Sequence, residues 1–275
     1  MVNYVVGILV IVLYWPVFSH LYQIRWDTVD YTHAYFILPL SLWLVWRKRT
    51  EIRSLPLEKV SLQTNVICVI TLLIGVLLLV FGLRQDYIFI QALSLIPILF
   101  GLTGYLYGKQ MVKLLSFPIL YLLLLVPPPL GIIDSITVPM RHGISILTEK
   151  ILFFLNYPIS REGLLLTIGY NDIFMGEPCS GFRSLITMIS LVLVYVYISK
   201  SNMSIKLILT LFIIPMALLG NLVRVITLCL ITFYFGEEAG QGFFHNFSGI
   251  VIFIITILGL ISLESLLDKF RAKTA

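Results

Sequence analysis

The chain has 275 residues, of which 59% are hydrophobic and only 12% are charged, and its mean hydropathy is +1.00. This composition excludes an ordinary soluble domain, and apolar runs of about 17–25 residues, the length that crosses a bilayer, recur along the chain. The net charge of +5 does not indicate nucleic-acid binding, because the basic residues lie in short segments between the apolar runs. We therefore expect an all-α polytopic membrane protein.

The first half of the chain predicts four membrane spans. Their ranges are residues 2–22 (interrupted by Trp15-Pro16), 34–46, 62–83 and 88–107. The first run lacks a basic leader and a small-residue cleavage site, so we expect it to remain as a span. The second ends at Arg47-Lys48-Arg49, the densest basic cluster, which the positive-inside rule places in the cytoplasm.

The middle of the chain is less regular. Residues 114–126 predict a short fifth span, ended by Pro127-Pro128-Pro129. Residues 134–157 have a helical pattern with charged residues on it, which predicts an amphipathic helix lying along the outer membrane interface. Residues 163–168 and 173–176, separated by a turn-like segment at 169–172, predict a small hairpin on the outer side before the sixth span.

Three more spans are expected at residues 182–198, 207–235 and 247–267, giving about eight transmembrane helices. With this number of spans, all the basic clusters fall on the same side of the membrane. This arrangement predicts a multi-pass protein of the cytoplasmic membrane with both termini in the cytoplasm. No linker or repeat divides the chain, so we expect a single domain over residues 1–275.

One polar block lies at the start of the sixth span and carries a thiol, a carboxylate, hydroxyls and a guanidinium. Its sequence is Gly176-Glu177-Pro178-Cys179-Ser180-Gly181-Phe182-Arg183-Ser184. The topology puts this block on the outer side, and Cys179 just before a helix N-terminus. Such a position favours a thiolate, and lowering a thiol pKa by ~1.5 units needs only about 2 kcal/mol. Cys179 is therefore a candidate nucleophile. The alternative is a small packing residue between helices, the role we expect for Cys68 and Cys229.

Two later segments place polar groups at a similar depth. Asn221 and Arg224 share one helix face in an otherwise apolar span, and His245 lies at the outer start of the eighth. A buried arginine needs a partner or a task. Together, the three side chains could form a catalytic site: Cys179 as the nucleophile, Arg224 as the stabiliser of the developing oxyanion and His245 as the base and then the acid. The alternatives are that Arg224 pairs with Glu177 or reaches the membrane surface, and that His245 is a hydrogen-bonded wall residue.

No cofactor is expected. The four histidines have no ligand spacing, and neither a zinc motif nor a phosphate-binding loop occurs.

At these blocks the sequence resembles the exosortase/archaeosortase family of membrane cysteine transpeptidases. Residues 177–184 look like the family's E-x-C-S-G-x-x-S block, residues 221–224 its N-x-x-R block and residues 245–249 its H-x-x-S-G block. Weaker likenesses extend upstream over residues 31–49, 117–128 and 161–163. Ala34 departs from the glycine expected after His33, outside the catalytic blocks.

The resemblance implies catalytic Cys179, Arg224 and His245. Supporting roles fall to the other residues of the three blocks: Glu177, Ser180, Gly181, Arg183, Ser184, Asn221 and Ser248. It also implies a reaction at the outer face of the cytoplasmic membrane. Exported proteins carrying a C-terminal sorting signal (a short motif such as Pro-Glu-Pro, a membrane helix and a basic tail) would be cleaved through a Cys179 thioester. The acyl group would then pass to an acceptor nucleophile or to water.

Two other functions remain open from the sequence. A membrane transporter or polysaccharide-export assembly protein would use Asn221 and Arg224 as a polar path and Cys179 as a packing residue. A degenerate family member would bind sorting signals without cutting them, although the Cys, Arg and His set is intact. Membrane lipid is the other expected partner, and nucleic acid is not expected.

Overall fold

The computed structural model describes residues 2–26, 33–55, 61–129, 131–199, 201–236, 239, 258–259, 261–267 and 269. The chain divides into two compact units, Met1–Pro129 and Leu130–Ala275. Each unit is described by itself below. The expectation of one domain over the whole chain stays a prediction.

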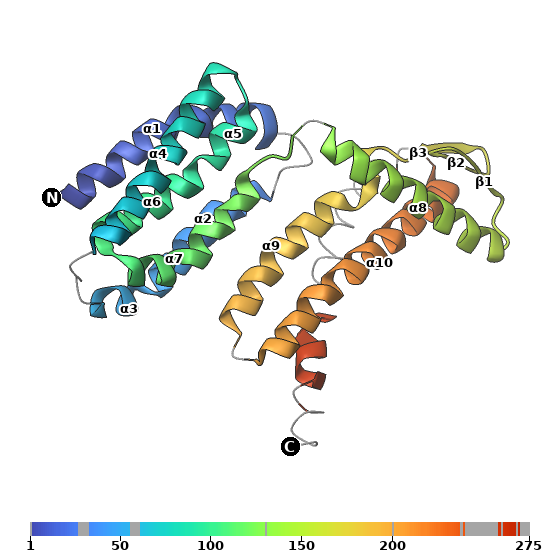
Figure 1. Cartoon of the computed structure of the whole chain (residues 1–275). Helices are drawn as coiled ribbons and strands as arrows, with labels where there is room; N and C mark the ends of the chain where they lie inside the picture. The colour runs from blue at the N-terminus through green and yellow to red at the C-terminus, as the bar shows by residue number, and fades with distance from the viewer. Residues whose placement is uncertain are drawn as a thin grey trace. The chain divides into compact units, whose positions relative to one another are not determined.

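The N-terminal unit is a helical bundle (Figure 1). Its elements are α1 (Val2–Leu21), the π-helical turn η1 (Tyr22–Trp26), α2 (Ala34–Arg47), α3 (Arg49–Ser54), α4 (Leu62–Arg84), α5 (Ile88–Leu93), α6 (Leu95–Tyr107), α7 (Lys109–Tyr121) and the 3-10 turn η3 (Leu122–Leu125). Helices α2 and α4 begin at the predicted residues and end one residue beyond the predicted ends.

Helices α4 and α6 pack closely because glycines remove side chains from their interface. A Cβ atom added at Gly75 of α4 would lie 2.6 Å from Ile98 Cγ1, and one at Gly101 of α6 would lie 2.8 Å from the Leu72 nitrogen. Cys68 is buried in α4, and a Cβ at Gly104 would collide with its sulfur. Small residues allow such close approach between membrane helices. Cys68 therefore has a packing environment, the role expected for it.

Three details of this unit differ from the sequence prediction. Helix α1 continues through Pro16 without the expected interruption. The predicted fourth span is two helices, α5 and α6, that meet at Ser94, whose hydroxyl donates to the Gln91 carbonyl at 2.6 Å. The predicted fifth span begins five residues early, at Lys109, and changes to a 3-10 turn after Tyr121.

The C-terminal unit contains α8 (Ile132–Phe154), β1 (Ile159–Glu162), β2 (Leu165–Ile168), β3 (Asn171–Phe174), the 3-10 turn η4 (Glu177–Ser180), α9 (Phe182–Ile198) and α10 (Met203–Phe235). Helices α9 and α10 lie side by side, and α8 packs against α10, η4 and β1 (Figure 1). Helix α9 has the bounds predicted for the sixth span, whereas α10 begins four residues before the predicted seventh.

The strands form an antiparallel sheet in the order β1-β2-β3. Where the sequence predicted a two-stranded hairpin, β2 and β3 are joined by the two residues Gly169 and Tyr170, and β1 adds a third strand. One face of the sheet buries Leu166, Ile168 and Ile173 in the core cluster that also holds Cys179. Asn171 of β3 donates its side-chain amide to the Thr232 carbonyl of α10 at 3.2 Å, which ties the sheet to that helix.

A carboxylate joins the last described helical segment to the turn between α9 and α10. Glu264 accepts hydrogen bonds from the hydroxyls of Ser199 and Ser201, both at 2.6 Å, and from the Tyr195 hydroxyl. Leu263 packs against the core between α9 and α10. Residues 261–267 therefore lie beside these two helices. The rest of the predicted eighth span, residues 247–267, falls mainly outside the described residues.

Within the described part of the chain, four helical segments are long and apolar enough to cross a membrane: Val5–Ile24, Leu62–Arg84, Ile88–Tyr107 and Met203–Phe235. Two shorter apolar helices are Ala34–Arg47 and Leu185–Ile198. This agrees with a helical membrane protein, while the number of eight spans stays a prediction.

Candidate active site

Cys179 lies in the short turn η4, between the end of the sheet and the start of α9. Its backbone N–H donates to the Gly176 carbonyl at 3.0 Å, which closes the turn. The residue is buried among Ile144 of α8, Met175 and Val225 of α10. The cysteine is therefore held by three elements of the C-terminal unit rather than displayed on a surface loop.

Asn221 of α10 holds the backbone of this turn. Its side-chain amide donates to the Cys179 carbonyl at 2.9 Å, and the asparagine is only 1% exposed. Gly181 has a φ of +75°, and a Cβ there would lie 2.7 Å from Asn221 Cγ. A side chain at residue 181 would be strained and would also collide with Asn221. Gly181 and Asn221 together let η4, the cysteine turn that carries Cys179, lie directly against α10.

The other supporting residues around Cys179 are placed less completely. Ser180 is buried, and its hydroxyl accepts a hydrogen bond from the N–H of Phe182, the first residue of α9, at 3.2 Å. Glu177 lies in η4, and Arg183 and Ser184 lie in the first turn of α9, but their side chains are outside the described part of the structure.

Two arginines from different helices act on the Cys179 thiol. Arg224 lies three residues after Asn221 in α10 and is half-buried, and Arg141 lies in α8 and is 8% exposed. The positive charges of both side chains lower the pKa of the thiol. The structure therefore brings Cys179, Asn221 and Arg224 together. His245 and Ser248 lie outside the described residues, so their distance from the thiol stays a prediction.

The expectation of a lowered thiol pKa is wrong for this structure. Burial raises the pKa of Cys179, and this effect exceeds the opposing effects of Arg224, a backbone hydrogen bond at Gly176 and Arg141. Removing a thiol from water disfavours its charged form, and a single turn of helix does not offset that cost here. The resting thiol is therefore neutral at pH 7 and needs a base before it can act as a nucleophile.

This predicts how the thiol reacts with pH. Because its pKa is raised, the rate of Cys179 modification by the neutral reagent iodoacetamide should rise with a midpoint above the roughly 8.5 of a free thiol. Replacing Arg224 with glutamine should move the midpoint still higher. Mass spectrometry of the Cys179 peptide across pH 6–10 measures both values. A wild-type midpoint near 7 would show that a neighbouring group overrides burial.

Arg141 is the site residue that the sequence prediction missed. The sequence showed it only as one charge in a predicted amphipathic helix lying along the outer membrane interface. In the structure the buried face of α8 carries Thr137, Arg141, Ser145 and Thr148, while Ile136 and Phe154 are among its exposed residues. The signal was the recurrence of polar residues at spacings of four, four and three, which places them on one side of a helix.

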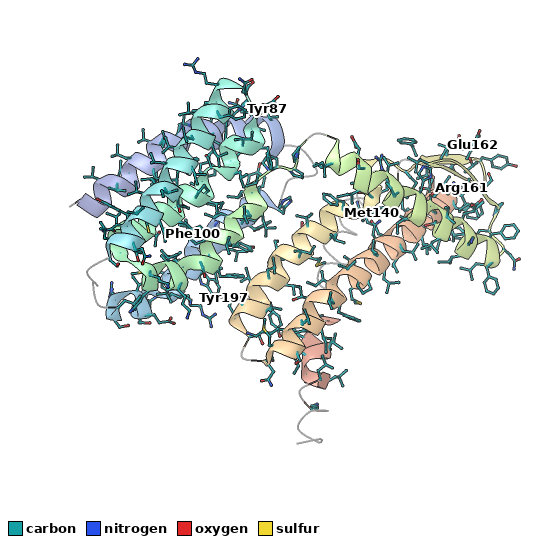
Figure 2. The ribbon with its side chains drawn as sticks, in the orientation of Figure 1. Tyr87, Phe100, Met140, Arg161, Glu162 and Tyr197 are labelled. Carbon is teal, nitrogen blue, oxygen red and sulfur yellow. The ribbon has the colours of Figure 1, made fainter. Side chains whose placement is uncertain are left out.

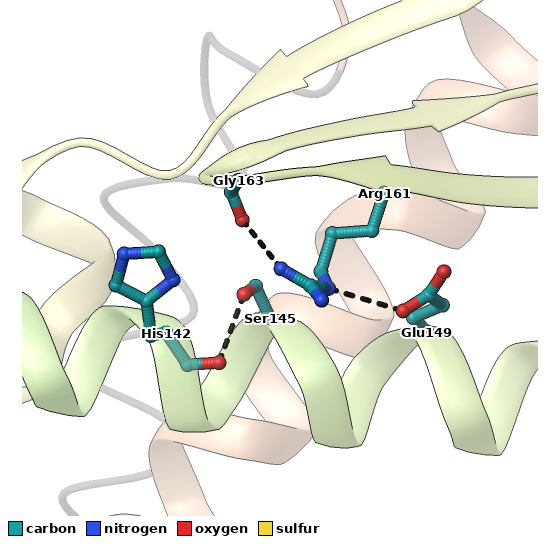
Figure 3. A network of polar contacts seen from close by, with 5 residues as sticks. All are labelled: His142, Ser145, Glu149, Arg161 and Gly163. Carbon is teal, nitrogen blue, oxygen red and sulfur yellow. Dashed lines mark hydrogen bonds and ion pairs between the residues drawn. The ribbon is translucent and has the colours of Figure 1, made fainter.

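A second arginine beside α8 has an ordinary structural role. Arg161 of β1 pairs with Glu149 of α8 at 3.1 Å and donates to the Gly163 carbonyl at 2.9 Å (Figure 3). Figure 2 shows Arg161 at the sheet and Met140, the residue before Arg141, in α8. The ion pair fixes the sheet to α8.

Among the described residues, no group of three or more histidine, cysteine, aspartate and glutamate side chains could hold a metal ion. The described chemistry of the site consists of a thiol, an amide and two guanidinium groups.

A family model described as transmembrane exosortase matches residues 26–262. The chain belongs to the transmembrane exosortase family. The matched range includes the cysteine turn, the Asn221 and Arg224 segment of α10 and the segment that contains His245. No curated protein and no solved structure matches the chain. Membership makes this a membrane protein of a family of sorting transpeptidases.

Proposed function

We propose that this exosortase is a cysteine peptidase or transpeptidase that cleaves C-terminal sorting signals of exported proteins with Cys179 as its nucleophile. The observation that carries the proposal is the support around the thiol. Asn221 fixes the Cys179 carbonyl at 2.9 Å, and the charges of Arg224 and Arg141 act on the sulfur. A cysteine with only a packing role needs neither a backbone clamp nor two cations.

The reaction that follows from this arrangement has two halves. A base, proposed to be His245, takes the thiol proton, and the sulfur attacks the carbonyl carbon of the scissile peptide bond. Arg224 stabilises the negative oxygen that forms. The C–N bond then breaks, the departing amine takes the proton from the histidine, and a thioester remains on Cys179.

In the second half, an acceptor nucleophile or water attacks the thioester carbonyl. The acceptor gives its proton to His245, the C–S bond breaks and Cys179 is restored as a thiol. The burial that keeps the resting thiol neutral makes a base necessary in both halves. His245 is proposed for this role from its sequence block.

The proposed site faces away from the cytoplasm. The basic clusters after the predicted spans support a topology in the cytoplasmic membrane with both termini inside. A substrate helix with a basic tail would take the same orientation, so its motif would lie at the outer surface. The partners are then exported proteins with a three-part C-terminal signal, surrounding membrane lipid and an acceptor whose identity is open.

The transporter alternative is less well supported. It needs Asn221 and Arg224 to line a path, but the Asn221 amide is bonded to the Cys179 carbonyl and the residue is fully buried. An amide engaged in holding a backbone is a poor lining group for a moving solute.

Trapping of the acyl-enzyme tests the proposal. A reporter from the same host, ending in a motif, a membrane helix and a basic tail, is incubated with the enzyme and no added acceptor. We expect a covalent adduct on Cys179 that hydroxylamine releases as a hydroxamate of the reporter, as a thioester requires. A reporter that is cleaved without any adduct on Cys179, when the reaction is quenched early in acid, would contradict a thioester pathway.

A further inference from the structure

Arg141 is a buried cation without a described partner. It is 8% exposed, its Nε has no hydrogen-bond partner among the described residues, and neither described ion pair includes it. Burying a guanidinium without a paired anion is unfavourable, because the charge loses its hydration without gaining a partner. Arg161 of β1, in contrast, has its charge matched by Glu149 of α8 (Figure 3). Within the part of the chain that the structure describes, no acidic side chain matches the charge of Arg141 in this way.

Other buried polar atoms of α8 and α10 also lack hydrogen-bond partners among the described residues. On the same face of α8, the hydroxyls of Thr137 and Thr148 are buried without a hydrogen bond in the described structure. The side-chain carbonyl of Asn221 is in the same condition, although its amide holds Cys179. Helix α8 packs against η4, which carries the cysteine. Donors and acceptors without partners therefore occur on both helices that flank the thiol.

We propose that Arg141 forms a substrate subsite that binds a carboxylate of the peptide next to the scissile bond. This deepens the proposed function and rests on it. The planar guanidinium matches a carboxylate with two parallel hydrogen bonds, and such charged bonds are strong in a site shielded from water. The unpartnered hydroxyls of Thr137 and Thr148 and the Asn221 side-chain carbonyl offer further hydrogen-bonding groups on the two helices beside the thiol.

The position of Arg141 decides where that carboxylate lies. Helix α8 packs against η4, and Ile144, three residues after Arg141, belongs to the apolar cluster that holds Cys179, so a carboxylate bound to Arg141 would lie on the side of α8 that faces the thiol. No described residue pairs with this charge, and in the proposal a substrate carboxylate does so. A substrate with an acidic side chain beside the scissile bond would thus be preferred, because a substrate without one leaves Arg141 unpaired. Buried polar sites reject ligands that lack the matching group for the same reason.

Two alkylating reagents test the subsite without a known substrate. Iodoacetate and iodoacetamide both transfer their CH2 carbon to the Cys179 thiolate with loss of iodide, but only iodoacetate carries a carboxylate. The ratio of their rates on the full-length protein in detergent measures the preference for an anion beside the thiol. In Arg141→Gln we expect this ratio to fall about tenfold or more, the loss typical for one charge-assisted hydrogen bond.

Two further variants make the result specific. Arg141→Lys keeps the charge without the fork and should retain part of the ratio. Lys150→Gln removes a positive charge from an exposed position of the same helix and should leave the ratio unchanged. Because Arg141 has no described partner to lose, thermal unfolding of Arg141→Gln should occur at or above the wild-type temperature. An unchanged ratio in Arg141→Gln would overturn the proposal.

Competing anions identify the source of the bound group. In the wild type, acetate should slow alkylation of Cys179 by iodoacetate more than alkylation by iodoacetamide. Neither phosphate nor phosphatidylglycerol vesicles should slow the iodoacetate reaction more than acetate does. Stronger protection by phosphate or by the vesicles would overturn the carboxylate assignment in favour of a phosphate. The reagent ratio does not depend on catalysis, so loss of the proposed function, shown by normal cleavage in Cys179→Ala, is distinguishable from loss of the subsite.

Discussion

Cys179→Ala is expected to lower cleavage of a tailed reporter by at least about 10³-fold, while the protein still accumulates in the membrane. The variant removes the atom that would form the thioester, while the hydrogen bond from Asn221 to the backbone carbonyl of residue 179 does not depend on that side chain. Folding should survive, because only one sulfur is removed from an apolar cluster with many other members. Cleavage is measured by separating precursor and product on a gel, with enzyme amount measured in the same membranes.

Cys229→Ala is the matched control. Cys229 lies in α10, is fully buried and belongs to the same apolar cluster as Cys179. Its removal costs a similar amount of packing but touches no proposed chemistry, so cleavage should stay within about twofold of the wild type per folded protein. If Cys179→Ala cleaves as well as Cys229→Ala does, Cys179 is a packing residue and the enzyme assignment fails.

The helices were predicted from sequence more completely than the elements between them. Helix α9 has the predicted bounds of residues 182–198, and α4 differs by one residue, because a long apolar run ending at polar or basic residues defines a membrane helix locally. Strand β1 was missed because it is four residues long and contains Arg161 and Glu162. Its strand conformation depends on pairing with β2, and pairing is not readable from four residues.

The site shows the same division between local and distant information. The pairing of Asn221 and Arg224 on one helix face follows from a spacing of three, and their proximity to Cys179 was suggested by similar membrane depth. Arg141 could not be placed in this way, because nothing in its own helix indicates that α8 packs against η4. The sign of the thiol pKa shift was also missed, since burial depends on all the elements packed around the sulfur.

The second large effect is expected from Gly181→Ala, which should lower reporter cleavage about 100-fold without changing any proposed catalytic group. Residue 181 has a φ of +75°, a conformation that costs a residue with a Cβ roughly 1–2 kcal/mol. The added Cβ would also lie 2.7 Å from Asn221 Cγ, so the cysteine turn must move away from α10. That movement breaks the bond between Asn221 and the Cys179 carbonyl, and a displacement of about 1 Å in a catalytic group can cost 10²-fold.

Gly163→Ala separates the two causes. Gly163 has a similar φ of +63° in the same unit, but a Cβ there would meet nothing within 4 Å. That variant therefore carries the backbone strain without the collision, and its cleavage should stay within a few-fold of the wild type. The double variant Gly181→Ala with Asn221→Gly relieves the collision but lacks the hydrogen bond, so it should remain slow even if its stability recovers. Equal cleavage by Gly181→Ala and Gly163→Ala would mean that the contact with Asn221 does not position Cys179 for reaction.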